Sequence, residues 1–326
     1  MAATNNEVWQ TGTITAIRDV AAGIKEFVIR QSLPAKAAAG SHIDLMIAID
    51  GQPTRRSYSV VSQSEDLAEV TIAVFQVRNS RGGSIAMHAL GVGATLDITQ
   101  PIQNFPFRFG AKRYVLLAGG IGVTAMVAMA SQAKRFGAEY ELHYVGRSRK
   151  AMAYLSELAE VHGIRLQTYV DDEGSGLDVA QLLTAVSSDT ELYMCGPIRL
   201  MDEVRRAWAN TGFDITNLRY ETFGASGWFD PEEFLVRVPE RRAEVLVGKN
   251  QTIVEALEAA GIEAMADCRK GECGLCEARI IRHTGTIDHR DVFYSASQKA
   301  DGEKIACCVS RLVSSDEPAS IDIILS

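Results

Sequence analysis

The sequence is poor in positive charge and has no long apolar run. Its 326 residues include 33 lysines and arginines against 41 aspartates and glutamates, a formal net charge of −8, so nucleic acid is not expected as a partner. No apolar stretch reaches the roughly 20 residues of a membrane-spanning helix. Residues 1–7 lack the basic-then-apolar pattern of a signal peptide. We therefore expect a cytoplasmic protein of two or three domains, with no membrane association.

Histidine and cysteine are both scarce. None of the six histidines stands near a cysteine at the spacing of a Rieske centre, which needs two histidines on one iron. The chain is therefore not expected to be a Rieske oxygenase itself. The six cysteines suit a reducing compartment better than a disulfide scaffold.

Three cysteines share one short segment, at the C-x4-C-x2-C spacing of a plant-type [2Fe-2S] site: Cys268, Cys273 and Cys276. Gly271 and Gly274 allow this loop to turn sharply around a cluster. The alternatives are structural thiols or a zinc site, although zinc ligands usually come as two cysteine pairs and here one ligand stands alone. The fourth ligand lies far downstream, where Cys307 and Cys308 are adjacent, and spacing does not choose between them.

Residues 8–109 predict an antiparallel β-barrel or sandwich, because short alternating runs rich in β-branched residues are separated by turn residues. These runs cover residues 12–17, 24–29, 42–47, 70–75 and 95–99. A further strand is expected over 59–62, after a proline-containing turn, and one short helix over 84–90.

Two polar clusters stand out in this region. The segment 56–59 combines an arginine, a tyrosine and serines that could clamp a planar anionic cofactor; the alternative is an exposed strand. The segment 81–84, Arg-Gly-Gly-Ser, precedes the short helix and could hold a terminal phosphate. A glycine turn with an N-capping serine is the alternative.

After Gly110 the pattern changes to a nucleotide-binding α/β domain. The apolar run 114–118 is followed by a glycine loop at 119–124 and a helix over 125–136, as in the first unit of a doubly wound parallel sheet. The glycine loop is not a full G-x-G-x-x-G, so alone it is weak evidence. Further strands are expected over 141–145, 165–170 and 191–195, with helices over 151–162, 178–186 and 198–210.

Two segments at the ends of these strands are candidate nucleotide contacts. Cys195-Gly196-Pro197 could lie against a nicotinamide, although a buried free cysteine explains Cys195 equally well. The segment 147–149, Arg-Ser-Arg, follows another strand where an adenosine ribose would lie. Basic residues there suit a 2′-phosphate, and acidic ones suit a 2′-hydroxyl.

The C-terminal part predicts a small α+β unit. Strands are expected over 234–238 and 243–247, then a helix from Thr252 to Gly261, and then the cysteine loop. More strand segments follow at 277–282, 304–308 and 320–325.

Together, these regions resemble phthalate dioxygenase reductase and its relatives, the vanillate O-demethylase reductases, over residues 8–326. The resemblance implies a multidomain chain: an FMN-binding antiparallel β-barrel (1–110), a doubly wound NAD-binding α/β domain (111–225), a linker (226–232) and an α+β plant-type [2Fe-2S] ferredoxin domain (233–326).

The resemblance also implies roles for individual residues. The flavin and its phosphate are expected against Arg56, Tyr58, Ser59, Arg81, Gly82, Gly83 and Ser84. The nucleotide is expected against Gly119, Gly120, Gly122, Thr124, Arg147, Ser148, Cys195, Gly196 and Pro197. Hydride transfer is expected to involve Arg56, Tyr58, Ser59, Cys195 and Phe223, which lies in an F-G-A segment. A C-V-S-R match makes Cys308 the fourth cluster ligand, and a D-H-R-D segment typical of these ferredoxin domains appears at 288–291.

The implied activity is that of the reductase component of an oxygenase system. Hydride from NADH reduces FMN, and single electrons pass through the cluster to a Rieske non-haem iron oxygenase, often one acting on aromatic acids or ethers. The Arg147-Ser148 pair favours NADH, and two arginines keep NADPH open. Ala125, where relatives carry proline, and residues 100–104, where relatives often carry G-P-R-N, depart from the family pattern.

A monomer is expected, with Arg269 and Lys270 either facing the partner or simply solvated. Two other functions stay open: an NAD(P)H flavin reductase with the ferredoxin domain as a docking module, and a redox sensor or electron carrier.

Overall fold

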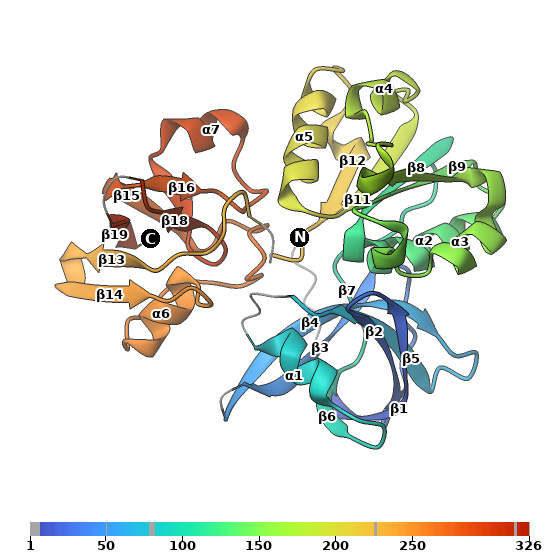
Figure 1. The fold of residues 1–326 in the computed structure, drawn as a ribbon, viewed down its shortest axis with the longest axis horizontal. Coiled ribbons are helices and arrows are strands. Elements are labelled where there is room, and N and C mark those ends of the chain that lie inside the picture. The colour runs from blue at the N-terminus through green and yellow to red at the C-terminus, as the bar shows by residue number, and fades with distance from the viewer. Residues whose placement is uncertain (1–6, 50, 78–81, 225–226, 316–317, 326) are drawn as a thin grey trace. The chain divides into compact units, whose positions relative to one another are not determined.

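The computed structural model describes residues 7–49, 51–77, 82–224, 227–315 and 318–325. The chain forms two compact units, one of Met1–Gly196 with Ala207–Glu221 and one of Pro197–Arg206 with Thr222–Ser326. The first unit contains the barrel and the parallel sheet, and the second contains the cysteine loop (Figure 1). None of the helices in the described ranges has the length and apolar character that crossing a membrane requires.

The N-terminal strands form the expected antiparallel barrel. They are β1 (Trp9–Ala21), β2 (Ile24–Gln31), β3 (Ser41–Ile49), β4 (Gln52–Gln63), β5 (Glu69–Phe75), β6 (Thr95–Thr99) and β7 (Ile102–Gln103). They lie in the order β4-β5-β2-β1-β6-β3-β7, and a further pairing of β3 with β4 closes the ring. Alternate side chains such as Ile14, Phe27 and Ile43 point inward and are almost fully buried. This alternation is typical of antiparallel strands with one face on the core and the other in solvent. The helix α1 (Gly83–Ala89) follows β5.

One strand of the barrel is longer than the sequence predicts. A strand over 59–62 was expected, whereas β4 begins at Gln52 and pairs along its first half with β3. Pro53 therefore lies in the strand and not in a turn before it. It is near the strand's first residue, where a missing N–H is tolerated.

The parallel sheet has the strand order typical of nucleotide-binding folds. Its strands are β8 (Arg113–Gly119), β9 (Tyr140–Gly146), β10 (Leu166–Val170), β11 (Thr190–Cys195) and β12 (Leu218–Glu221). They lie in the order β10-β9-β8-β11-β12 and all neighbours are parallel. The connecting helices are α2 (Val123–Arg135), α3 (Leu155–His162), α4 (Val179–Thr184) and α5 (Ile198–Ala209). Because the strand order reverses between β8 and β11, ligands are expected in the crevice at their carboxyl ends.

The helix expected over 151–162 begins later than predicted. The segment Arg149–Ala151 is a short 3-10 turn, and α3 starts at Leu155. Tyr154 has a left-handed backbone, with φ 60, and its hydroxyl donates a 2.9 Å hydrogen bond to the Glu26 carboxylate of β2. A contact with the barrel thus overrides the helical pattern of the sequence.

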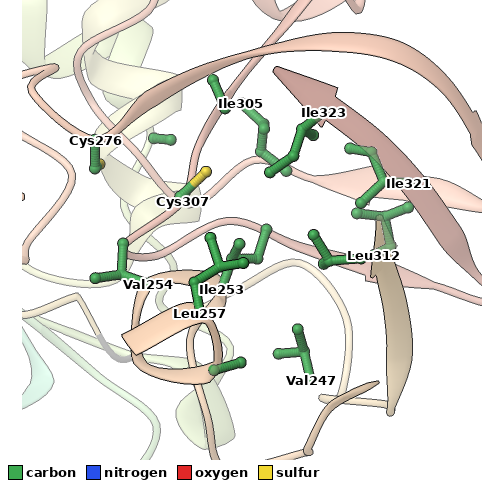
Figure 2. Packing of buried hydrophobic residues seen from close by; sticks show 14 of the residues in the cluster. Val247, Ile253, Val254, Leu257, Cys276, Ile305, Cys307, Leu312, Ile321 and Ile323 are labelled. Carbon is green, nitrogen blue, oxygen red and sulfur yellow. The ribbon is translucent and has the colours of Figure 1, made fainter. Parts of the chain in front are cut away.

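The second unit contains a mixed sheet and, in its described part, two helices besides residues 198–206 of α5. Its strands are β13 (Phe234–Val238), β14 (Ala243–Val247), β15 (Glu277–Thr284), β16 (Thr286–Asp288), β17 (Lys304–Ala306), β18 (Arg311–Val313) and β19 (Ser320–Leu325). The main sheet has the order β14-β13-β19-β15-β17, and β16 pairs with β18 separately. The helix α6 (Ile253–Ala259) begins at the predicted Thr252, which forms a capping box with Glu255. Its apolar face, including Val254 and Leu257, packs into the core shown in Figure 2.

The sequence analysis did not predict β16, β18 or the helix α7 (Ala296–Asp301). The helix had a readable signal, because Ser295 and Gln298 form a capping box at its start, the S-x-x-Q pattern of a helix N-terminus. The two strands are only three residues long, too short for a periodic pattern to be recognised.

Candidate functional site

The structure brings together the two polar clusters of the barrel. Arg56 lies on β4, and a Cβ placed on Gly83 would be 2.8 Å from its Nε atom. Gly82 has φ +87 and a Cβ there would meet Ile49 at 2.3 Å, so this turn requires glycine. Ser84 does not cap α1, whose N-cap is Gly82; its hydroxyl instead accepts a hydrogen bond from Val77 N at 3.2 Å. Arg81 lies outside the described residues.

Further along β4 are Tyr58 and Ser59, and Ser59 contacts a strand of the parallel sheet. Tyr58 is half-buried, and desolvation raises the pKa of its hydroxyl to about 12 although Arg56 opposes the shift. Ser59 is buried, and its hydroxyl donates a hydrogen bond of 3.4 Å to Glu221 Oε2, at the last residue of β12.

Glu221 is a candidate site residue that the sequence analysis missed. Only 4% of its surface is exposed, which is unusual for a carboxylate. It is the register partner of Cys195, the last residue of β11. Ser59, Cys195 and Glu221 therefore gather near the carboxyl ends of β11 and β12. The strand β12 was not predicted, so the sequence offered no signal for this carboxylate.

The glycine loop after β8 packs directly on the segment after β11. A Cβ on Gly122 would lie 2.1 Å from the carbonyl oxygen of Cys195 and 2.9 Å from Gly196 N. Gly120 has φ +54, a left-handed conformation that suits glycine. Thr124 is buried and its hydroxyl donates to the Ile121 carbonyl at 2.9 Å, so this hydroxyl is occupied within the loop. Gly119 is buried at the end of β8, and Pro197 follows Gly196 in the chain.

The basic residues after β9 differ in their surroundings. The Arg149 guanidinium pairs with Glu173, with Nε 2.7 Å from Oε1. Arg147 is exposed, Ser148 is half-buried, and no hydrogen bond or ion pair of the Arg147 side chain is found among the described residues. Arg147 is thus the arginine available to a ligand at this strand end.

The cysteine sulfurs of the second unit converge. The Cys308 thiol forms hydrogen bonds with Cys268 and Cys276, and Cys273 forms one with Cys268. The hydrogen bond from Cys308 lowers the pKa of the Cys268 thiol, and the backbone N–H groups of Lys270 and Glu272 lower it further. The same hydrogen bond raises the pKa of Cys308. Hydrogen bonds thus connect the four thiols into one group, which fits a site that binds all four as thiolate ligands.

Cys307 has a different environment from its neighbour. Both cysteines are buried in the core of the unit, Cys307 near Ile253 and Ile305 (Figure 2). The Cys308 thiol hydrogen-bonds with Cys268 and Cys276, whereas desolvation is the main effect on Cys307 and raises the pKa of its thiol. A buried cysteine of this kind is inert. The placement supports Cys308 as the fourth ligand.

Four thiolates are the ligand set of a plant-type [2Fe-2S] cluster, in which they are divided between two irons. Cys268, Cys273, Cys276 and Cys308 supply that set.

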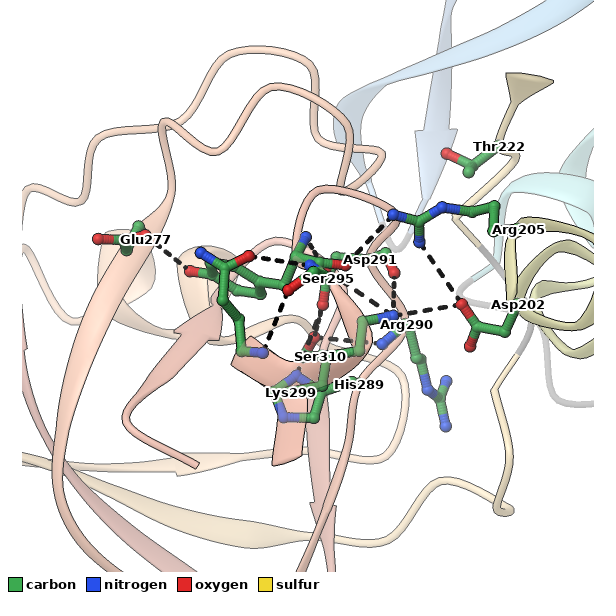
Figure 3. A network of polar contacts seen from close by, with 12 residues as sticks. Asp202, Arg205, Thr222, Glu277, His289, Arg290, Asp291, Ser295, Lys299 and Ser310 are labelled. Atoms are coloured by element: carbon green, nitrogen blue, oxygen red, sulfur yellow. Dashed lines mark hydrogen bonds and ion pairs between the residues drawn. The ribbon is translucent and has the colours of Figure 1, made fainter. Parts of the chain in front are cut away.

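The D-H-R-D segment lies directly behind the cysteine loop. Gly271 has φ +76, and a Cβ there would be 2.9 Å from Asp291 Cα. Asp291 is fully buried and accepts hydrogen bonds from Tyr294 N at 2.9 Å and Ser310 Oγ at 3.4 Å (Figure 3). Lys299 Nζ donates to its carbonyl at 2.6 Å. This network fixes the backbone against which the loop rests.

The segment expected as a linker is attached to the same network. Asp288 Oδ1 accepts a 3.0 Å hydrogen bond from Trp228 N, and Arg290 Nη2 donates to the Phe229 carbonyl at 3.0 Å. Asp288 and Arg290 are themselves paired at 2.6 Å and both are buried. The described part of the linker therefore belongs structurally to the ferredoxin domain. Phe223, which precedes this segment in the chain, is half-buried.

Three domain families match the chain. The oxidoreductase FAD-binding domain matches residues 11–107. The N-terminal domain of the DmmA-like dimethylamine monooxygenase subunits matches residues 99–218. The 2Fe-2S iron-sulfur cluster binding domain matches residues 236–312. A flavin-binding barrel and a [2Fe-2S] domain, both predicted from the sequence, are therefore confirmed.

Whole-chain comparisons give the same picture. The carnitine monooxygenase reductase subunit of Acinetobacter baumannii is 32% identical over 91% of this chain and 93% of its own length. The vanillate O-demethylase oxidoreductase of a Pseudomonas species is 33% identical over 84% of this chain and 86% of its own. The structure of phthalate dioxygenase reductase is 27% identical, with a TM-score of 0.74 over 98% of both chains. The expected oxidoreductase function is thus confirmed, and the chain belongs to the family of flavin- and [2Fe-2S]-containing oxygenase reductases.

Proposed function

We propose that this protein takes hydride from NADH onto FMN and passes single electrons through its [2Fe-2S] cluster to a Rieske non-haem iron oxygenase. The observation that carries the proposal is the convergence of Cys268, Cys273, Cys276 and Cys308, whose thiols contact one another. Four thiolates can hold a [2Fe-2S] cluster, which accepts and donates one electron at a time. A flavin supplies the step that such a carrier lacks, because it accepts two electrons as a hydride and releases them singly.

Arg56, Tyr58 and Ser59 are proposed to hold the flavin, with the turn 82–84 and Arg81 at its phosphate. The contact between Arg56 and Gly83 supports this assignment, because it places a guanidinium at a turn whose backbone has no side chains in the way. FMN is proposed over FAD because residues 94–109 contain no recognisable second site for an adenylate. Release of the flavin by heat, followed by chromatography, tests this: FMN is expected, and FAD would contradict it.

The nucleotide is proposed to bind at the carboxyl ends of β8 and β11, against Gly119, Gly120, Gly122, Thr124, Cys195, Gly196 and Pro197. The nicotinamide is proposed to approach the flavin beside Cys195 and Glu221, which are register partners; the Glu221 carboxylate accepts a hydrogen bond from Ser59. Cys195 and Phe223 are proposed to contact the two rings. Arg147 and Ser148 are proposed at the adenosine ribose of NADH. Initial rates with NADH and NADPH test the preference.

The electron acceptor is proposed to be a separate oxygenase, reached by a cytoplasmic, monomeric reductase. Relatives named as reductase subunits of carnitine monooxygenase and toluene-4-sulfonate monooxygenase support an oxygenase partner, and the vanillate O-demethylase relative supports an aromatic acid or ether as its substrate. Arg269 and Lys270 lie on the cysteine loop and are proposed to face the partner; Arg269 also pairs with Glu258 at 2.6 Å. Lys270→Glu is expected to slow reduction of the partner but not of a small dye.

A haem protein is the second candidate acceptor. A self-sufficient cytochrome P450 monooxygenase is 35% identical over 98% of this chain, which spans 41% of that protein, with a TM-score of 0.66. One relative is named the beta subunit of a haem-dependent oxidative N-demethylase. Mixing the NADH-reduced protein anaerobically with a Rieske oxygenase and, separately, with a cytochrome P450 decides between them. Faster reduction of the P450 would contradict the Rieske proposal.

A further inference from the structure

Thr222 is hydrogen-bonded to the cysteine loop through both its backbone and its side chain. It follows β12 directly in the chain and is only 3% exposed. Its N–H donates to Glu272 Oε1 at 2.7 Å. Its hydroxyl lies 2.7 Å from the Lys270 carbonyl and 2.9 Å from Glu272 Oε1. Since a hydroxyl has one proton to donate, the closer Lys270 carbonyl is its main acceptor, and the backbone N–H holds Glu272.

The two residues held by Thr222 both donate a backbone N–H to the sulfur of Cys268. Lys270 N lies 3.5 Å and Glu272 N 3.4 Å from the Sγ atom of Cys268. These are the distances of N–H···S hydrogen bonds. Thr222 therefore binds the Lys270 carbonyl and the Glu272 carboxylate, while the backbone N–H groups of the same two residues donate to Cys268.

The donor segment needs such a restraint because its backbone is strained. Arg269, between Cys268 and Lys270, has φ 49, a left-handed conformation that is uncommon for a residue with a Cβ. Gly271 has φ +76. Alternating conformations of this kind turn successive N–H groups toward one point and form an anion-binding nest. Without an external anchor, residues 269–271 are expected to relax toward ordinary conformations and turn the N–H groups away.

We propose that Thr222 is a positioning residue that sets the reduction potential of the cluster by fixing the N–H donors of Lys270 and Glu272 on Cys268. Reduction adds negative charge to the cluster, and hydrogen bonds to the sulfurs stabilise that charge, so they raise the potential. Loss of the Thr222 hydroxyl lowers the potential. The inference rests on the proposed function only in taking Cys268 as a ligand.

The test is a redox titration followed by low-temperature electron paramagnetic resonance on the full-length protein. Thr222→Val removes the hydroxyl and keeps the side-chain shape. It is expected to reduce the equilibrium constant for one-electron reduction of the cluster by roughly tenfold, about 59 mV, and to change the g-values. Thr222→Ser restores the hydroxyl and is expected to restore the wild-type potential. The potential of the flavin is expected to be the same in all variants.

Thr284→Val is the matched control in the same unit. Its hydroxyl donates to the Pro318 carbonyl at 3.0 Å and makes no contact with the cysteine loop, so no shift in the potential is expected. A Thr222→Val protein with the wild-type potential, or an equal shift in Thr284→Val, would overturn the proposal. If Thr222→Val does not fold, Thr222→Ala removes the same hydroxyl and must show the same shift. A wild-type protein without any [2Fe-2S] signal would instead overturn the proposed function.

Discussion

The carbonyl oxygen of Cys195 lies 2.1 Å from the point where a Cβ on Gly122 would be. Gly122 lies in the loop after β8, and Cys195 is the last residue of β11; the order of the parallel sheet reverses between these neighbouring strands. The absence of a side chain at Gly122 thus lets two loops meet at the edge of the sheet where nucleotides bind. The requirement is one of space, because the φ of Gly122 is −59 and suits any residue.

Gly122→Ala is therefore expected to weaken NADH binding by tenfold or more, because the added methyl must push the Cys195–Gly196 backbone away from the loop. The dissociation constant of NADH, measured by flavin fluorescence, checks this. Gly176→Ala is the control, since a Cβ there meets nothing within 4 Å. Equal affinities of the two variants would contradict the assignment of the glycine loop.

Cys308→Ser is expected to abolish the [2Fe-2S] absorption and electron transfer to a one-electron protein acceptor, while direct reduction of a dye by the flavin continues. Cys307→Ser is expected to retain the cluster but to lose about 1–3 kcal/mol of unfolding free energy, because it buries a hydroxyl in the apolar core. Iron content, visible spectra and urea unfolding distinguish these results. Loss of the cluster in Cys307→Ser alone would show that the ligand is wrongly assigned.

Arg290→Ala is expected to destabilise the protein by about 3–5 kcal/mol, because it leaves the buried Asp288 carboxylate without its partner. It also frees the Phe229 carbonyl, so the segment 227–229 should become sensitive to proteases. Arg149→Ala breaks an exposed pair with Glu173 and is the control, with little change expected. Unfolding in urea and limited proteolysis measure both effects. A change of the same size in both variants would contradict the role of the buried pair.

The stability of the second unit is expected to fall in acid through Asp291. Burial opposes ionisation of Asp291, but the nearby His289 imidazole, 3.6 Å away, the charge of Lys299 and the Tyr294 N–H outweigh it, so its pKa is lowered in the folded state. The stabilisation is therefore complete above the pKa of an unfolded aspartate, about 3.9, and is lost as the pH falls through the folded value. Urea unfolding between pH 5 and 3 should show a shallower pH dependence in Asp291→Asn than in the wild type. An unchanged slope would contradict this.

The fold was largely predictable from the sequence because its elements have strong local patterns. Alternating runs gave the barrel strands, and continuous apolar runs gave the buried strands of the parallel sheet. Local patterns failed where distant contacts decide. The late start of α3 depends on the hydrogen bond between Tyr154 and Glu26, which no helical periodicity contains.

In the candidate site, too, residues with a local sequence pattern were predicted and residues defined by distant contacts were not. Spacing identified the cysteine loop, but only the structure separates Cys307 from Cys308, because both are buried and the Cys308 thiol is the one that hydrogen-bonds with Cys268 and Cys276. Glu221 was missed because its partner Ser59 is 162 residues away, and a glutamate at a strand end is ordinarily exposed. The hydrogen bond between Thr222 and Glu272 could not be predicted either, because the two residues are 50 positions apart in the sequence.

The most direct test of electron transfer within the chain is an anaerobic titration of the purified protein with NADH, followed by low-temperature electron paramagnetic resonance. Bleaching of the flavin together with a reduced [2Fe-2S] signal is the predicted result. Bleaching of the flavin without any cluster signal would contradict it, and would mean that the protein is a flavin reductase whose ferredoxin domain carries no electrons.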